Sequence, residues 1–232
     1  RAPVLVEKTE IYLTASIGIA IYPTEDGESV SILKSASAAK DYAKNSGGNA
    51  FQFSFRQINM QCQQRLSLEA RLRRAMDRDE FVLFYQPQLD VQTNAITGVE
   101  ALLRWHIKDH GWVEPDEFIS IAEETGLVIP IGEWVMSRAC KQLAEWRQAG
   151  KAAIGMSVNL SALQFENPEM HAIFKRIIQN SGINPQLLTL ELTESILLGE
   201  IEKKIESMKR LKELGLKLSI DDFGTGYSSL RY

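Results

Sequence analysis

Residues 187–222 read LLTLELTESILLGEIEKKIESMKRLKELGLKLSIDD, and this stretch determines the class of fold. The apolar run 187–192 predicts a buried strand, and 200–214 repeats apolar residues with the spacing of an amphipathic helix. Gly215 marks the end of that helix, and 216–220 predicts a second strand. A strand, a helix of this length and another strand make a βαβ unit, which predicts two parallel strands.

The same alternation extends back to residue 80. Strands are expected at 81–86, 98–105 and 153–160, and helices at 115–125, 131–149 and 170–181. This pattern predicts an α/β fold with a mainly parallel sheet, closed either as a doubly wound sheet or as a β/α barrel. A barrel needs eight strands and five are expected before residue 232, so a barrel would be incomplete in this chain.

The N-terminal part has a different pattern. It predicts a strand or a bent hairpin over 9–21, a helix over 29–46 and a short strand at 51–53. Residues 59–79 are rich in Gln, Arg, Leu and Glu without Gly or Pro, which predicts a linker helix with its arginines on a solvated face. We therefore expect three parts: 1–58, the linker helix 59–79, and 80–232.

Composition narrows the class of protein. The net charge of −4 over 232 residues argues against a nucleic acid polymer as the main partner, because such binders usually carry a basic face. No apolar run reaches the roughly 18 to 20 residues that span a bilayer, and we expect no signal peptide. Cys62 and Cys140 lie in no paired motif, so reduced thiols in a cytoplasmic domain are expected.

Two adjacent carboxylates, Asp221 and Asp222, follow the last predicted strand and precede a glycine-rich loop. Neighbouring carboxylates repel each other at neutral pH unless a cation or a proton lies between them. One interpretation is a divalent metal site at the end of a strand. The other is an acidic turn that caps a following helix.

Oxygen-bearing side chains recur at the ends of the preceding strands. In α/β folds the chemistry lies at the C-terminal ends of strands, where a buried unpaired charge costs several kcal/mol. An oxygen-only set favours Mg2+, Mn2+ or Ca2+ over zinc. The positions, one for each of four strands, are Glu100, Asn159, Glu191 and Asp221.

Each position also has a purely structural interpretation. Asn159 could belong to a helix N-cap, Glu100 could pair with Arg104 on the same strand face, and Glu191 and Glu194 could pair with lysines of the neighbouring helix. Taken together, four strand ends that all present oxygen ligands favour the metal site.

These residues carry a resemblance to the EAL-domain family of cyclic di-GMP phosphodiesterases, which covers residues 66 to 232. The motifs stand in the family's order. They are Tyr85-Gln86-Pro87, Glu100-Ala101-Leu102-Leu103-Arg104, Asn159-Leu160-Ser161, Glu191-Leu192-Thr193-Glu194, and Asp221-Asp222-Phe223-Gly224-Thr225-Gly226.

The resemblance implies a β/α barrel of the EAL type with two divalent cations, Mg2+ or Mn2+, at its mouth. It implies hydrolysis of one phosphodiester bond of cyclic di-GMP to the linear dinucleotide. By position, the implied metal ligands are Glu100, Asn159, Glu191, Asp221 and Asp222, with Asp221 and Asp222 serving the second cation. Glu194 is the implied anchor for the glycine-rich loop. The implied substrate contacts are Gln86, Leu102 and Arg104. Glu100, Glu191, Glu194, Asp221 and Asp222 form the implied catalytic set.

Residues 1–58 resemble the C-terminal part of a GGDEF-like domain. The match is the phrase 13–20 (LTASIGIA) with Pro23, whereas Ser37, Lys40 and Asp41 differ from the family's wording. The resemblance implies a fragment of a tandem GGDEF–EAL signalling protein, with GTP as a possible ligand of the GGDEF-like half and a possible attachment of the parent to the inner membrane. A family lysine, a glutamate and a glutamine on later strands are expected beyond residue 232, so this fragment alone is expected to be inactive.

Two other functions stay open. An EAL barrel can be a receptor that binds cyclic di-GMP without cleaving it, and the helix 131–149 can serve an interaction scaffold. EAL barrels commonly pair, so a homodimer through the EAL domain is expected.

Overall fold

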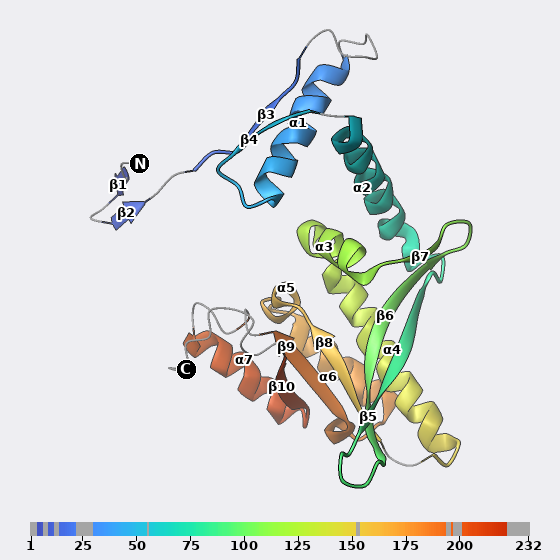
Figure 1. The fold of residues 1–232 in the computed structure, drawn as a ribbon. Helices are drawn as coiled ribbons and strands as arrows, with labels where there is room; N and C mark the ends of the chain where they lie inside the picture. Colours follow the sequence, from blue (N-terminus) through green and yellow to red (C-terminus); the bar gives the residue numbers. More distant parts are fainter. Residues whose placement is uncertain are drawn as a thin grey trace. The chain divides into compact units, whose positions relative to one another are not determined.

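The computed structural model describes residues 4–6, 9–11, 14–21, 30–54, 56–151, 154–193, 196 and 201–221. The chain divides into two compact units, Arg1–Ala70 and Arg71–Tyr232 (Figure 1). The boundary falls inside helix α2 (Arg56–Ala75), which is therefore shared by both units. A helix was predicted over 59–79, and its presence is confirmed with an end four residues earlier.

The described residues of the first unit form two small sheets. Strand β1 (Val4–Val6) pairs antiparallel with β2 (Thr9–Ile11). Strand β3 (Ile17–Ile19) pairs parallel with β4 (Phe51–Phe53), and helix α1 (Val30–Asn45) lies between them in the sequence. The predicted helix and the predicted strand at 51–53 are confirmed.

The expectation of one strand or a bent hairpin over 9–21 is wrong, because β2 and β3 belong to different sheets. The partner of β3 is β4, which the chain reaches only after crossing over through α1. Gly18 permits this packing. A Cβ atom on Gly18 would lie 1.8 Å from the backbone oxygen of Ala36 in α1, so a larger residue would separate the strand from the helix.

In the described part of the second unit, six strands form one sheet (Figure 1). Strands β10, β9, β8 and β6 are parallel neighbours in that order, and β5 and β7 pair antiparallel with β6. Their bounds are β5 Phe81–Leu89, β6 Ile96–Ile107, β7 Gly111–Val113, β8 Gly155–Leu160, β9 Leu188–Thr193 and β10 Lys217–Asp221.

The helices of this unit match the predicted ones closely. Helix α4 begins three residues before the prediction, and the short α5 and a 3-10 turn were not predicted. The bounds are α3 Pro115–Thr125, α4 Val128–Gln148, α5 Ala162–Phe165, α6 Met170–Ser181, η1 Pro185–Leu187 and α7 Ile201–Glu213. Within the described residues, none of these helices, nor those of the first unit, has the length and apolar character of a membrane span.

The mainly parallel sheet predicted from the sequence is confirmed for β6, β8, β9 and β10, whereas β5 and β7 run antiparallel to β6. Strands β5 and β6 are longer than predicted and leave only residues 90–95 between them. So short a connection cannot make a parallel crossover, which takes a dozen or more residues. Asp90 closes the hairpin turn, since its carboxylate accepts hydrogen bonds from the backbone of Gln92 and Thr93 at 3.0 and 2.8 Å.

The two faces of the sheet differ in polarity. Side chains alternate between faces along a strand, and residues in register on adjacent strands share a face. One face is apolar and buried, and helix α4 packs against β5 and β8 on it. Its buried members include Val99, Ala101, Met156, Val158, Leu188 and Leu190. The opposite face carries the polar residues of the same strands. Burial of apolar surface therefore does not explain why these polar residues occupy their positions.

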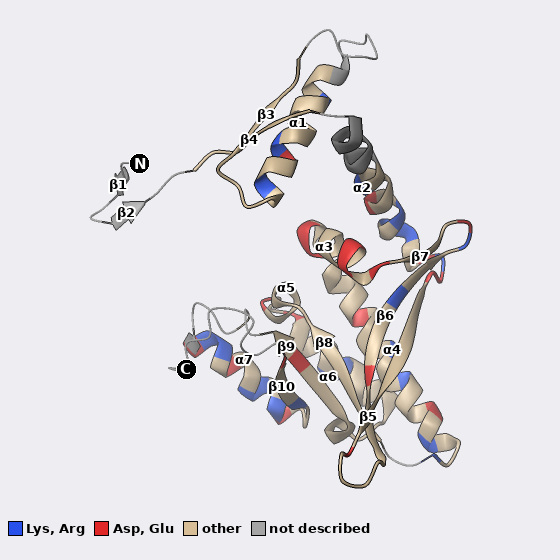
Figure 2. Cartoon of the chain, viewed as in Figure 1, with Lys and Arg blue, Asp and Glu red and all other residues tan. Residues whose placement is uncertain are grey.

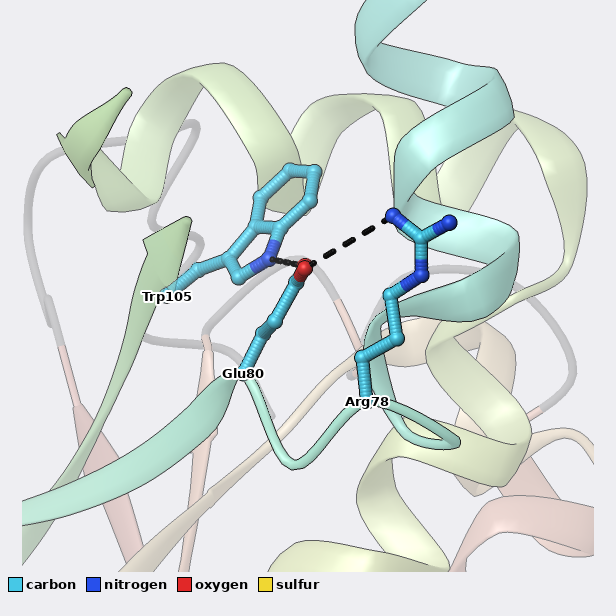
Figure 3. A network of polar contacts seen from close by, with 3 residues as sticks. All are labelled: Arg78, Glu80 and Trp105. Atoms are coloured by element: carbon cyan, nitrogen blue, oxygen red, sulfur yellow. Dashed lines mark hydrogen bonds and ion pairs between the residues drawn. The ribbon is translucent and has the colours of Figure 1, made fainter. Parts of the chain in front are cut away.

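A cluster of aromatic side chains fixes the C-terminal half of β6 to the helices. Trp105 is fully buried, and its ring centre lies 5.6 Å from that of Phe118 in α3 and 6.0 Å from that of Phe81 in β5. Its indole Nε1 donates a hydrogen bond to Glu80 Oε2 at 3.0 Å, and Arg78 Nη1 lies 3.9 Å from Glu80 Oε1 (Figure 3). The Glu80 carboxylate thus satisfies the one polar atom of the Trp105 side chain.

Replacing Glu80 by Leu should destabilise the second unit by about 1 to 3 kcal/mol, because it leaves a buried indole N–H without an acceptor. Glu80→Gln keeps an acceptor oxygen at the same place and should cost less, since the ion pair with Arg78 is long and half exposed. Urea unfolding of both variants measures the difference. Equal losses would show that the hydrogen bond to Trp105 contributes nothing.

Candidate active site

Glu100 lies in the middle of β6 on the polar face. Its register partners are Gln86 on β5 and Ser157 on β8, so these three side chains stand in one row across the sheet. Asn159, two residues beyond Ser157, shares this face and donates its Nδ2 to Glu100 Oε1 at 2.7 Å. Glu100 is half-buried and Asn159 is exposed, so their free lone pairs face the solvent side of the sheet.

Glu191 extends the row onto β9. It is in register with Asn159 on β8 and with Ser219 on β10. Burial raises the pKa of the Glu191 carboxyl above its usual value, a hydrogen bond from Ser157 lowers it, and the negative charges of Glu100 and Asp221 raise it again. The influence of both charges shows that three carboxylates from three strands are electrostatic neighbours.

Asp221 ends β10 and is exposed, in register with Thr193 at the end of β9. Its position two residues after Ser219 places it on the same face as Glu191. Asp222 and Glu194, the other two acidic positions singled out in the sequence, lie outside the described residues. Figure 2 shows acidic positions on β6 and β9 of this sheet.

The structural interpretation of the segment 159–161 as a helix N-cap is confirmed for Ser161 but not for Asn159. Ser161 is the N-cap of α5, and its Oγ accepts a hydrogen bond from the backbone of Gln164, while Gln164 Oε1 accepts one from the Ser161 backbone. This capping box satisfies the start of α5 without Asn159. The Asn159 side chain is therefore available to Glu100.

Arg104 and Glu100 lie on one face of β6, but they contact different groups. Arg104 Nη1 donates to the Leu103 carbonyl oxygen at 2.9 Å, and the guanidinium carbon lies 5.8 Å from the centre of the Phe84 ring. Glu100 contacts Asn159 instead. The alternative in which Glu100 and Arg104 serve only each other is therefore not supported, and both remain turned to the face that carries Gln86 and Leu102.

Sequence reasoning missed Ser157. It is buried, it faces Glu100 in register, and it contributes the hydrogen bond to Glu191. A signal was present, because Ser157 precedes Asn159 by two positions in an otherwise apolar strand and so had to share its face.

The donor set fits a hard divalent cation in its chemistry, because it offers carboxylate and amide oxygens from four adjacent strands. Among the residues that the structure describes, no three His, Cys, Asp or Glu side chains gather tightly enough to form a finished metal site. Burial is the main cause of the raised pKa of Glu191, and the negative charges of Glu100 and Asp221 add to it, as expected for neighbouring carboxylates that repel one another.

Comparison with known proteins places this chain in a family. The family model described as "EAL domain" matches residues 69–232. MucR of Pseudomonas aeruginosa, named a bifunctional diguanylate cyclase/cyclic di-GMP phosphodiesterase, is 39% identical over 230 residues, which are 99% of this chain and 34% of that protein. PdeR of Escherichia coli, named a cyclic di-GMP phosphodiesterase, is 34% identical over 230 residues, again 99% of this chain and 34% of that protein. The chain thus spans about a third of the length of these relatives.

Solved structures agree on the fold. The structure titled "PaMucR Phosphodiesterase, c-di-GMP complex" is 41% identical with a TM-score of 0.68, covering 72% of this chain and 67% of that one. The FimX EAL domain of Xanthomonas citri, solved in complex with c-diGMP, is 27% identical with a TM-score of 0.63, covering 72% of this chain and 64% of that one. The second unit therefore has the TIM-barrel-like α/β fold of these proteins, and the chain belongs to the EAL domain family.

Proposed function

We propose that the protein carrying this chain hydrolyses one phosphodiester bond of cyclic di-GMP and releases the linear dinucleotide. The observation that carries this proposal is the convergence of Glu100, Asn159, Glu191 and Asp221 from four adjacent parallel strands onto one polar face. The names of MucR and PdeR, both phosphodiesterases of this nucleotide, support the choice of substrate.

Two divalent cations, Mg2+ or Mn2+, are the proposed cofactors. Glu100, Asn159, Glu191 and Asp221 would hold one, and Asp221 with Asp222 would hold the other. When bound, the cations would neutralise the charge of the scissile phosphate and activate the attacking water. The support is the oxygen-only donor set and the mutual repulsion of its carboxylates, which a cation would relieve. Glu194 is proposed to anchor the loop that follows Asp222.

Three side chains are proposed to hold the nucleotide. Gln86 stands beside Glu100 in register, and Leu102 and Arg104 follow on the same strand face. The Arg104 guanidinium is half-buried and held at the Leu103 carbonyl, so it offers a preset cation for a phosphate oxygen. Gln86 would orient the substrate beside Glu100, and Leu102 would pack against its apolar part.

The first unit is proposed to be the C-terminal part of a GGDEF-like domain. Its β3–α1–β4 unit agrees with a compact α+β element, and the match to MucR includes residues before 58. GTP binding in that half of the parent, attachment of the parent to the inner membrane and pairing through EAL domains are further parts of this proposal.

The test is turnover of cyclic di-GMP by the full-length protein with Mg2+ or Mn2+, with products separated by chromatography. We expect the linear dinucleotide, and its formation should stop on addition of a chelator. Tight binding of cyclic di-GMP without any product would refute hydrolysis and favour the receptor function.

A further inference from the structure

The polar face of β6 continues into an exposed aromatic patch formed by Phe84 of β5 and Trp112 of β7. Phe84 is 47% exposed and Trp112 is 55% exposed, and Val82 and His106 border them. Large apolar side chains that gather on a surface commonly mark a binding site. None of the roles proposed above uses this patch.

The patch has a defined geometry. The ring centres of Phe84 and Trp112 lie 5.3 Å apart at an interplanar angle of 71°, and those of Trp112 and His106 lie 4.8 Å apart. The guanidinium carbon of Arg104 is 5.8 Å from the Phe84 ring centre. These contacts hold two aromatic rings beside a cation while leaving about half of each ring residue accessible.

Register places the patch next to the proposed catalytic row. Phe84 pairs with Leu102, and Trp112 pairs with His106, so both share the face of Glu100. Leu102, the partner of Phe84, is two residues beyond Glu100, which is about 7 Å along a strand, and this is comparable with the distance between a phosphate and the base of the same nucleotide. His106, the partner of Trp112, is six residues or about 20 Å beyond Glu100, so Trp112 reaches the site only through its ring contact with Phe84.

We propose that Phe84 and Trp112 form a stacking subsite for one purine base of the dinucleotide. This inference rests on the proposed function. A phosphate that meets Arg104 and a cation held at Glu100 would leave its attached base in reach of the two rings, and aromatic side chains beside an arginine are the usual platform for an unstacked base. The flat, half-exposed rings suit the aromatic base of a nucleotide, and the adjoining Arg104 guanidinium suits its anionic phosphate. The alternative is that a second copy of the chain binds this aromatic patch. Such an interface would not need Arg104 beside the rings, so the nucleotide explains the arrangement better.

The test compares Trp112→Leu with Trp112→Phe in the full-length protein. Leu keeps an apolar side chain but has no π-face, whereas Phe keeps one. For cyclic di-GMP we expect Trp112→Leu to raise KM by about 10-fold or more, with kcat within about twofold, and Trp112→Phe to retain most of the affinity. Quenching of Trp112 fluorescence by the nucleotide should disappear in both variants. Phe84→Leu provides an independent variant with the same expected rise in KM.

Wild-type KM in both Leu variants would overturn the inference while leaving the phosphodiesterase proposal intact. Equal losses in the Leu and Phe variants of Trp112, or a rise in KM that accompanies a changed molecular mass in solution, would also overturn it, because they point to a structural or self-association role. If the wild-type protein neither binds nor cleaves cyclic di-GMP, the proposed function itself fails.

Discussion

Replacing Glu100 by Gln should lower kcat for cyclic di-GMP by at least about 100-fold. The change removes one negative charge from the centre of the row while keeping the size of the side chain, and the loss of a metal ligand should exceed the 10- to 100-fold effect of an outer-shell partner. The hydrogen bond from Asn159 can persist because Gln retains an acceptor oxygen. We therefore expect the fold to survive and catalysis to fail.

The matched control is Glu145→Gln, which makes the same chemical change on α4. Glu145 is exposed and pairs with Lys141 at 4.0 Å, an i,i+4 contact of little energetic weight. Steady-state kinetics should give wild-type rates for Glu145→Gln. Turnover above a tenth of the wild-type rate in Glu100→Gln would contradict the role proposed for Glu100.

Replacing Trp105 by Ala should destabilise the second unit by about 3 to 5 kcal/mol, the largest loss expected from any single change on β6. The side chain is fully buried against Phe81 and Phe118. Its removal opens a cavity and also leaves the Glu80 carboxylate without the hydrogen bond from the indole N–H.

Trp112→Ala is the matched control, because it removes the same side chain from the neighbouring strand β7. Trp112 is more than half exposed, so its loss should change the free energy of unfolding by about 0.5 kcal/mol or less. Denaturant unfolding of the two variants measures the contrast. Similar losses in both would show that the core does not form around Trp105 as the structure describes.

The helices and the parallel strands could be predicted because their signals are local. Apolar spacing, Pro115 at the start of α3 and the left-handed glycines Gly126 and Gly182 after α3 and α6 mark element ends without reference to the rest of the chain. The candidate site residues were predicted for a related reason. Adjacent parallel strands bring side chains on one face close together, so an oxygen-bearing side chain on each strand implies a shared site, although Glu100 lies in the middle of β6 rather than at its end.

The parts that escaped prediction depend on pairing rather than on local pattern. Strand β5 runs antiparallel because only a short turn, closed by Asp90, connects it to β6. The predicted strands ended too early and began too late, so the predicted connection was longer than the observed one. Strand β7 is three residues long, and only its pairing with β6 makes it a strand. The patch of Phe84 and Trp112 could not be predicted, because its rings meet only when β5 and β7 flank the same strand.

The measurement that tests the central claim most directly is a crystal structure of the full-length protein with Mn2+ and a non-hydrolysable cyclic di-GMP analogue, with manganese located by anomalous scattering. The account predicts manganese bound by Glu100, Asn159, Glu191 and Asp221, beside the phosphate of the analogue. Manganese bound elsewhere, or a nucleotide seated away from the polar face of β6, β8 and β9, would contradict it.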